Sequence, residues 1–277
     1  MMQTSIQAVS TLIALLLPLL AFSAPVVPGG VYLWPIPEGA SQVSFQNKPV
    51  MRVADAALIG IPISQATGAA ALNYRLGSQQ LSHEFIVMDK AYTEQHITLT
   101  NKAMVNPPPA SLDRIREESV RQRALYNTFA DPVDLGAGFK MPLHGITTSL
   151  YGHRRFFNGE PRSPHSGLDI AADPGTIVRA AGNATITLAD NLYFNGNTLF
   201  LDHGQGLITM YCHLSELLVD VGDSIIQGQE IGKVGATGRA TGPHLHWSVS
   251  LNGNRVDPEL FMQALNAQTV DTAADPN

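Results

Sequence analysis

The chain has 277 residues, which is enough for two domains of ordinary size or one large domain. Charged residues make up 14% of it, it contains 24 glycines and 18 prolines, and its formal net charge is −6. This composition favours a turn-rich β protein over a helical bundle, argues against global disorder, and offers no basic surface for nucleic acid.

The first 24 residues carry no charge and contain the apolar run TLIALLLPLLAF. The run is short for a bilayer span, and Ala21 and Ser23 offer the small residues that signal peptidase requires. We therefore expect residues 1–23 to be a signal peptide, and the mature protein to be exported with no stable membrane span. An uncleaved anchor is the alternative, because no Lys or Arg precedes the run. Cys212 is the only cysteine, which excludes an intrachain disulfide.

Residues 26–104 read as short runs with period-2 alternation, separated by turn residues, which predicts a small N-terminal β module. Residues 105–130 are expected to form a linker. It begins with the stiff, non-helical stretch VNPPPA and continues as a charged helix over SLDRIREESVRQRALYNTF, with Ser111 placed to cap it.

From residue 131 the β pattern returns, and 131–265 is expected to be a second, mainly β domain. Asn195-Gly196 and Asn252-Gly253 are signals for type I′ hairpin turns. The last stretch, 266–277, is polar and is expected to be a disordered tail.

Two pairs of side chains in this second domain suggest a metal site. His165 and Asp169 are four residues apart in SPHSGLDIAA, and His244 and His246 are two apart in GPHLHW. Even spacing on an extended chain puts both members of a pair on one face. Imidazole and carboxylate are ordinary zinc ligands, and a catalytic zinc takes three protein ligands. His165, Asp169 and one of His244 and His246 would make that set.

The glutamate base of an H-E-x-x-H site is absent from the chain. Another group must therefore move protons. The histidine of the 244/246 pair that does not bind metal and His213, in MYCHLS, are the two candidates.

Three motifs, HSGLD at 165–169, YCHL at 211–214 and GPHLHW at 242–247, resemble the lysostaphin-type (LytM-like) zinc endopeptidases of peptidoglycan. The resemblance covers roughly 140–262 and implies an antiparallel, duplicated-hybrid-motif-like peptidase domain, preceded here by the β module and helix. It implies that His165, Asp169 and His246 bind one Zn²⁺. His213 and His244 then orient and deprotonate the attacking water and stabilise the oxyanion.

The resemblance also implies a substrate. Exported Gram-negative members of the family suggest that a metal-activated water hydrolyses cross-links between peptidoglycan stem peptides, specifically the D-Ala–diaminopimelate bond. Cleavage of glycine bridges is the alternative within the family. A different class of function is that of a catalytically inactive LytM-like activator of cell-wall amidases. Because every ligand and assisting histidine is intact, the enzyme is the leading interpretation.

Neighbouring residues receive simpler interpretations. Strand alternation predicts that Cys212, Tyr211 and Trp247 point away from the site and pack in the core, and His203 is expected to be structural. The bases that precede the first ligand are candidates for binding substrate carboxylates or are solvated surface charges: Arg154, Arg155 and Arg162. The other histidines match no motif and are expected to have no function: His83, His96, His144 and His153.

Overall fold

The computed structural model describes residues 25–135 and 138–273 of the chain. The expected signal peptide, residues 1–23, lies outside the described residues, and so do the last four residues. No helix within the described ranges is long and apolar enough to cross a membrane.

Two small antiparallel sheets form the N-terminal part, one ordered β1-β5-β4 and the other β3-β2-β6-β7. Large side chains from both sheets, Trp34, Phe45, Ile59, Leu72 and Phe85, are buried in one cluster, so burial of apolar surface holds the sheets together. The strands are β1 (Val31–Pro35), β2 (Ala40–Phe45), β3 (Lys48–Pro49), β4 (Met51–Val53), β5 (Ala56–Gly60), β6 (Gly68–Leu76) and β7 (Gln79–Val87).

Between the N-terminal sheets and the second domain lie one strand, two short 3-10 turns and the expected helix. They are β8 (Glu94–Ile97), η1 (Lys102–Met104), η2 (Pro109–Ser111) and α1 (Leu112–Tyr126). Ser111 does occupy the N-cap position, but its side chain makes no capping hydrogen bond. Its backbone is already helical, as part of the preceding turn, whereas a capping residue normally has an extended backbone. β8, within the range expected for the β module, instead pairs in parallel with β10 of the second domain.

An antiparallel sheet of eight strands, ordered β18-β14-β15-β16-β20-β12-β9 with β21 beside β20, dominates the second domain. Two three-stranded sheets accompany it, β13-β19-β17 and β11-β10-β8. The strands are β9 (Ile146–Ser149), β10 (Arg154–Phe157), β11 (Glu160–Pro161), β12 (Leu168–Ala171), β13 (Ile177–Arg179), β14 (Ala184–Leu192), β15 (Gly196–Asp202), β16 (Ile208–Leu214), β17 (Glu216–Leu217), β18 (Ser224–Ile225), β19 (Glu230–Lys233), β20 (His244–Leu251) and β21 (Asn254–Val256).

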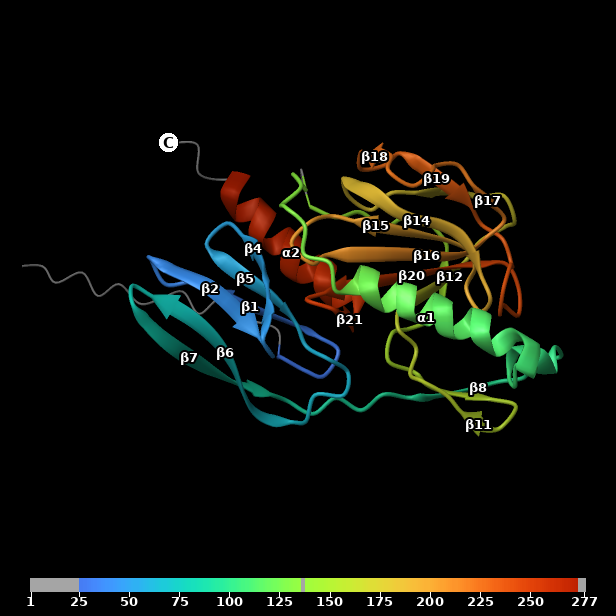
Figure 1. Cartoon of the computed structure of the whole chain (residues 1–277), viewed down its shortest axis with the longest axis horizontal. Helices are drawn as coiled ribbons and strands as arrows, with labels where there is room; N and C mark the ends of the chain where they lie inside the picture. Colours follow the sequence, from blue (N-terminus) through green and yellow to red (C-terminus); the bar gives the residue numbers. More distant parts are fainter. Residues whose placement is uncertain (1–24, 136–137, 274–277) are drawn as a thin grey trace, which may run out of the picture.

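Helix α1 lies across one face of the large sheet, and the N-terminal sheets sit at one end of the molecule (Figure 1). Tyr126 of α1 packs against Phe200 in a small buried cluster on this face. The N-terminal part is fixed to the second domain by polar contacts, since Asn252 binds the backbone N–H and carbonyl of Gly60. A Cβ on Gly60 would lie 2.8 Å from Cβ of Leu251, so this approach requires glycine.

A second helix, α2 (Pro258–Ala273), occupies most of the segment expected to be a disordered tail. Its first turn is capped by Asp257, whose carboxylate accepts from the N–H of Glu259 at 3.1 Å, and Phe261 and Leu265 are fully buried. This apolar pair, spaced i, i+4, lies just before residue 266 and anchors the helix that continues into the expected tail.

The two expected hairpin turns differ. Asn252 and Gly253 both have positive φ in a two-residue loop, as type I′ requires. Residues 193–195 instead form a three-residue loop, in which Asn195 does not have a positive φ; Gly196, directly after the loop, does.

Candidate metal centre and active-site cleft

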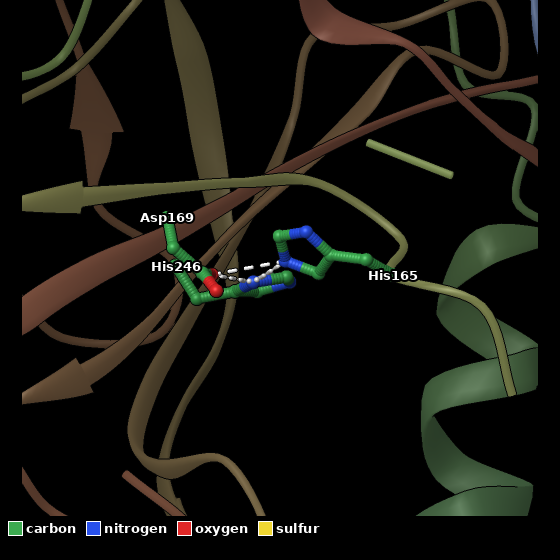
Figure 2. Close-up of side chains that lie close together, drawn as sticks. All are labelled: His165, Asp169 and His246. Atoms are coloured by element: carbon green, nitrogen blue, oxygen red, sulfur yellow. Dashed lines mark hydrogen bonds and ion pairs between the residues drawn. The ribbon is translucent and has the colours of Figure 1, made fainter. Parts of the chain in front are cut away.

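Three side chains from separate segments converge on one point of the large sheet (Figure 2). Asp169 on β12 lies directly opposite His246 on β20, so the pleat presents both on the same face. His165 reaches the same point from the loop before β12. Its Nε2 lies 2.9 Å from Oδ1 of Asp169 and 3.0 Å from Nδ1 of His246, and the last two atoms are 2.7 Å apart.

Gly167 allows the loop that carries His165 to approach β20 this closely. A Cβ at Gly167 would lie 2.2 Å from the carbonyl oxygen of Trp247, which no side chain tolerates. The glycine between His165 and Asp169 in the HSGLD motif is therefore required by the packing of the site.

Outer hydrogen bonds fix the two imidazoles. Nδ1 of His165 lies 2.7 Å from the carbonyl oxygen of Leu150, and because a carbonyl only accepts, this nitrogen carries the proton. Nε2 of His165 then presents a lone pair to Asp169 when the ring is neutral. On His246 the roles of the ring nitrogens are exchanged: Nε2 meets the Ser248 hydroxyl at 2.9 Å, and Nδ1 faces the cluster. Such outer partners orient metal-binding histidines in proteins.

The electrostatics of the cluster suit a cation. Burial alone would raise the pKa of Asp169, but its close contacts with the His165 and His246 rings hold it well below its usual range, so the carboxylate is ionised. Burial lowers the pKa of His246 to about 4, against the opposing effect of Asp169. Two imidazole nitrogens and a carboxylate oxygen thus point at one another, and their mutual repulsion is relieved by a divalent ion. The donor set fits zinc.

Arg155 on β10 binds the other oxygen of the same carboxylate, with Nη2 2.5 Å from Oδ2 of Asp169. Its guanidinium is held in turn by Oε1 of Gln95 at 3.0 Å and by the Ser149 hydroxyl at 3.1 Å. Gln95 belongs to β8, so the segment that joins the N-terminal sheets to the second domain contributes directly to this network. Sequence reasoning considered Arg155 as a substrate contact or a solvated surface charge. It did not single out Gln95, because a parallel pairing between distant strands has no local signal.

A β-bulge brings His213 into the site. Cys212 and His213 together oppose the single residue Thr198 of β15, and His213 has a φ of 62°. The extra residue breaks the alternation of β16. The His213 ring therefore lies 4.8 Å from that of His244 and 6.2 Å from that of His246, between centroids. Bulges and positive φ values in non-glycine residues are common at active sites.

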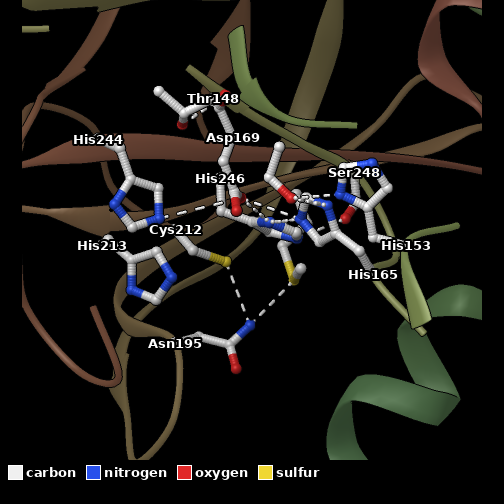
Figure 3. A network of polar contacts seen from close by, with 12 residues as sticks. Thr148, His153, His165, Asp169, Asn195, Cys212, His213, His244, His246 and Ser248 are labelled. Atoms are coloured by element: carbon white, nitrogen blue, oxygen red, sulfur yellow. Dashed lines mark hydrogen bonds and ion pairs between the residues drawn. The ribbon is translucent and has the colours of Figure 1, made fainter. Parts of the chain in front are cut away.

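His213 and His244 lie side by side next to the cluster (Figure 3). Nδ1 of His213 donates to the carbonyl of Thr237 at 2.8 Å, and Nδ1 of His244 donates to the carbonyl of Gly242 at 2.8 Å. Each ring thus directs Nε2, and not Nδ1, away from the backbone carbonyl, and Nε2 of His244 lies 3.9 Å from Oδ1 of Asp169. Burial, followed by the neighbouring histidines, lowers the pKa of His213 to about 3, so it is a neutral acceptor at physiological pH.

Strand alternation predicted that Cys212 points away from the site, opposite to its neighbour His213. In the structure Cys212 pairs with His246 across the strands and faces the same side of the sheet as His246. The bulge explains the difference. Its thiol is fully buried and accepts from Nδ2 of Asn195 at 3.1 Å, and burial raises its pKa to about 12. The backbone carbonyl of Asn195 also accepts from the backbone N–H of His213 at 2.8 Å, so the loop supports the bulge. Sequence reasoning used Asn195 only as a turn residue and did not predict this role.

The remaining histidines lie apart from the cluster or at its edge. His203 is buried and bonded to the Asn183 carbonyl and the Thr209 hydroxyl, a structural arrangement. His153 lies at the edge, where its Nδ1 is 3.3 Å from the Ser149 hydroxyl. Tyr211 and Trp247 are fully buried in the main core, as expected.

Comparison with known proteins agrees with this geometry. The profile of peptidase family M23 matches residues 163–258, a range that contains all five clustered residues. The crystal structure of a peptidase M23 from Pseudomonas aeruginosa is 36% identical, with a TM-score of 0.72, and the match covers 88% of this chain and 97% of that one.

Curated relatives match over a shorter range. Peptidoglycan DD-endopeptidase ShyC of Vibrio cholerae is 43% identical over 116 residues, which is 42% of this chain and 24% of that protein. DD-carboxypeptidase/endopeptidase Mpg of Neisseria meningitidis is 43% identical over 94 residues, 34% of this chain and 22% of that protein. The matches thus span about a quarter of the length of these relatives. The predicted mainly β, antiparallel fold class and the resemblance to lysostaphin-type enzymes are confirmed, and the chain belongs to the metallopeptidases of family M23.

Proposed function

We propose that this protein is a periplasmic zinc endopeptidase that hydrolyses the peptide cross-links of peptidoglycan at the D-Ala–diaminopimelate bond. The observation that carries the proposal is the convergence of His165, Asp169 and His246 beside a second pair of histidine rings. Relatives named peptidoglycan DD-endopeptidases, 43% and 40% identical over the matched parts, support the choice of substrate. The apolar N-terminal run supports export.

His165, Asp169 and His246 would hold the metal through Nε2, a carboxylate oxygen and Nδ1, respectively. When bound, zinc supplies Lewis acidity, which makes a water nucleophile more acidic and the scissile carbonyl more electrophilic. Arg155 and the outer hydrogen bonds keep the three donor atoms in place before substrate arrives.

His213 and His244 would carry out the proton transfers. Their Nδ1 protons are held by backbone carbonyls, so Nε2 is the atom that accepts a proton from the attacking water. The same nitrogen, once protonated, donates a hydrogen bond to the oxyanion. It then transfers its proton to the leaving amine. Because burial keeps His213 neutral, this ring begins each cycle ready to accept a proton.

The test uses purified protein and isolated sacculi. We expect about one zinc per chain by elemental analysis, soluble fragments released from sacculi, and loss of that release with chelator. Mass spectrometry of fragments from defined dimeric muropeptides identifies the bond. Asp169→Ala should abolish zinc binding and release, whereas His144→Ala, which replaces an exposed histidine of the same domain, should change neither.

Two outcomes would overturn the proposal. Zinc-free protein that solubilises nothing alone but stimulates a separate amidase would identify an activator. Cleavage of glycine bridges with the diaminopimelate cross-link left intact would replace the proposed substrate.

A further inference from the structure

A cavity of about 410 Å³ opens beside the metal cluster and is lined by His165, His213 and His246. Four arginines also line it, and no Asp or Glu does: Arg155, Arg162, Arg239 and Arg255. The cavity therefore concentrates positive charge in a place where the substrate of this enzyme would lie.

Two of these arginines are already neutralised. Arg155 is paired with Asp169 at 2.5 Å, and Arg162 is paired with Glu160 at 2.6 Å. These two ion pairs hold the site and its rim together. A substrate carboxylate would have to displace Asp169 or Glu160 to bind either arginine.

Arg239 and Arg255 are different, because neither has a carboxylate within ion-pair distance among the described residues. The Arg239 guanidinium lies 4.7 Å from the ring centre of Phe157 and 4.4 Å from that of Phe194, and its one hydrogen-bond acceptor is the Met104 carbonyl at 3.4 Å. Arg255 lies 5.3 Å from the ring centre of Tyr126.

The surroundings of Arg239 restrict how it can bind. Aromatic rings contact the guanidinium carbon, while guanidinium N–H groups donate in the plane, in a fork that matches a carboxylate. Burial, with the nearby charges of Arg155 and Arg162, lowers the pKa of Arg239 to about 10, so the side chain remains charged at neutral pH. A charged, partly desolvated donor without a carboxylate partner binds an anion more strongly than a solvated one does.

We propose that Arg239 and Arg255 bind a free carboxylate of the substrate beside the scissile bond, so that the enzyme selects acidic peptides over their amidated counterparts. This inference rests on the proposed endopeptidase function and names a specificity that the function alone does not require. Arg239 is the stronger determinant, because it lies in the loop that leads directly to His244.

The test compares two synthetic cross-linked peptides that differ in one group. The residue that supplies the amine of the scissile bond carries a free carboxylate in one peptide and a carboxamide in the other. We expect wild-type kcat/KM to favour the carboxylate by about 10- to 100-fold, the range of a hydrogen bond to a charged group. Arg239→Gln should bring this ratio towards one, mainly through KM, and Arg255→Gln should reduce it in part.

Two further variants separate charge recognition from folding. Arg239→Lys keeps the charge and should retain part of the preference, which a purely structural role would not explain. Arg179→Gln removes an exposed arginine that pairs with Glu230 elsewhere in the domain, and it should leave the ratio unchanged. Calorimetric binding of the carboxylate and carboxamide product peptides gives a second readout that does not depend on turnover.

The outcomes are distinguishable. Wild-type protein that cleaves neither peptide contradicts the proposed function itself. Wild-type protein that cleaves both at equal rates leaves that function standing and overturns the inference. A preference that persists unchanged in both Arg239→Gln and Arg255→Gln overturns it as well.

Discussion

His203 should make the protein sensitive to acid. Its ring is buried, with Nδ1 2.7 Å from the Asn183 carbonyl and Nε2 2.7 Å from the Thr209 hydroxyl. Burial lowers its pKa from 6.5 to about 4. Below pH 6.5 the unfolded chain therefore binds a proton that the folded chain does not. The stability contributed by neutral His203 is complete above pH 6.5 and is lost as the pH falls towards 4.

The size of the effect follows from this window. Between pH 7.5 and pH 5.0 the unfolded state gains the proton over about 1.5 pH units, which at 1.36 kcal/mol per unit destabilises the fold by about 2 kcal/mol. His203→Gln removes the titrating group and should remove this part of the acid loss, although it also weakens the fold at both pH values by disturbing the two hydrogen bonds.

The assay is urea denaturation of chelator-treated wild-type and His203→Gln protein at pH 7.5 and 5.0. Other buried histidines, such as His213, titrate in both proteins, so their contributions cancel in the comparison. Wild type should lose about 2 kcal/mol more than the variant between the two pH values. An equal loss in both proteins would show that His203 is not held neutral by burial, and an NMR titration of its ring would then give a pKa near 6.5.

Three further predictions concern the site. Gly167→Ala should lower metal affinity by about tenfold or more without removing a donor, because the methyl group meets the β20 backbone. Gly242→Ala, where a Cβ meets nothing within 4 Å, is the matched control, and equal affinities by chelator competition would contradict the packing explanation. His213→Ala should keep the metal but lose about 10²- to 10⁴-fold in kcat, whereas Asp169→Ala should lose both, and a metal-free His213 variant would reverse the assigned roles. Cys212 should not react with a thiol reagent at pH 8 in the folded protein, since its thiol is buried with a raised pKa; rapid labelling without unfolding would contradict this.

Features that depend on local spacing could be predicted from the sequence. The even spacing of His244 and His246 indicated a shared face, which β20 provides, and the pairing of β12 with β20 adds Asp169. His165 is different, because it reaches the site from the loop before β12 and not along a common strand. The charged run of α1 likewise predicted a helix, since it contains few residues that break one.

Features that depend on contacts between distant segments could not be predicted in this way. His213 turns towards the site because β16 carries one residue more than its partner strand, and the period-2 pattern gives no sign of this. Arg239 is a loop residue, and only the fold brings Phe157 and Phe194 against its guanidinium. Helix α2 was not predicted, because it crosses from the expected β domain into the polar stretch after residue 265, and tertiary burial of Phe261 and Leu265 stabilises it.

The parallel pairing of β8 with β10 bears on how a minimal catalytic fragment should be cut. A fragment that starts at residue 131 omits Gln95, and Arg155 then loses the amide that fixes its guanidinium against Asp169. The smallest fragment with a complete site should start before Glu94, so that it contains β8 as well as the second domain.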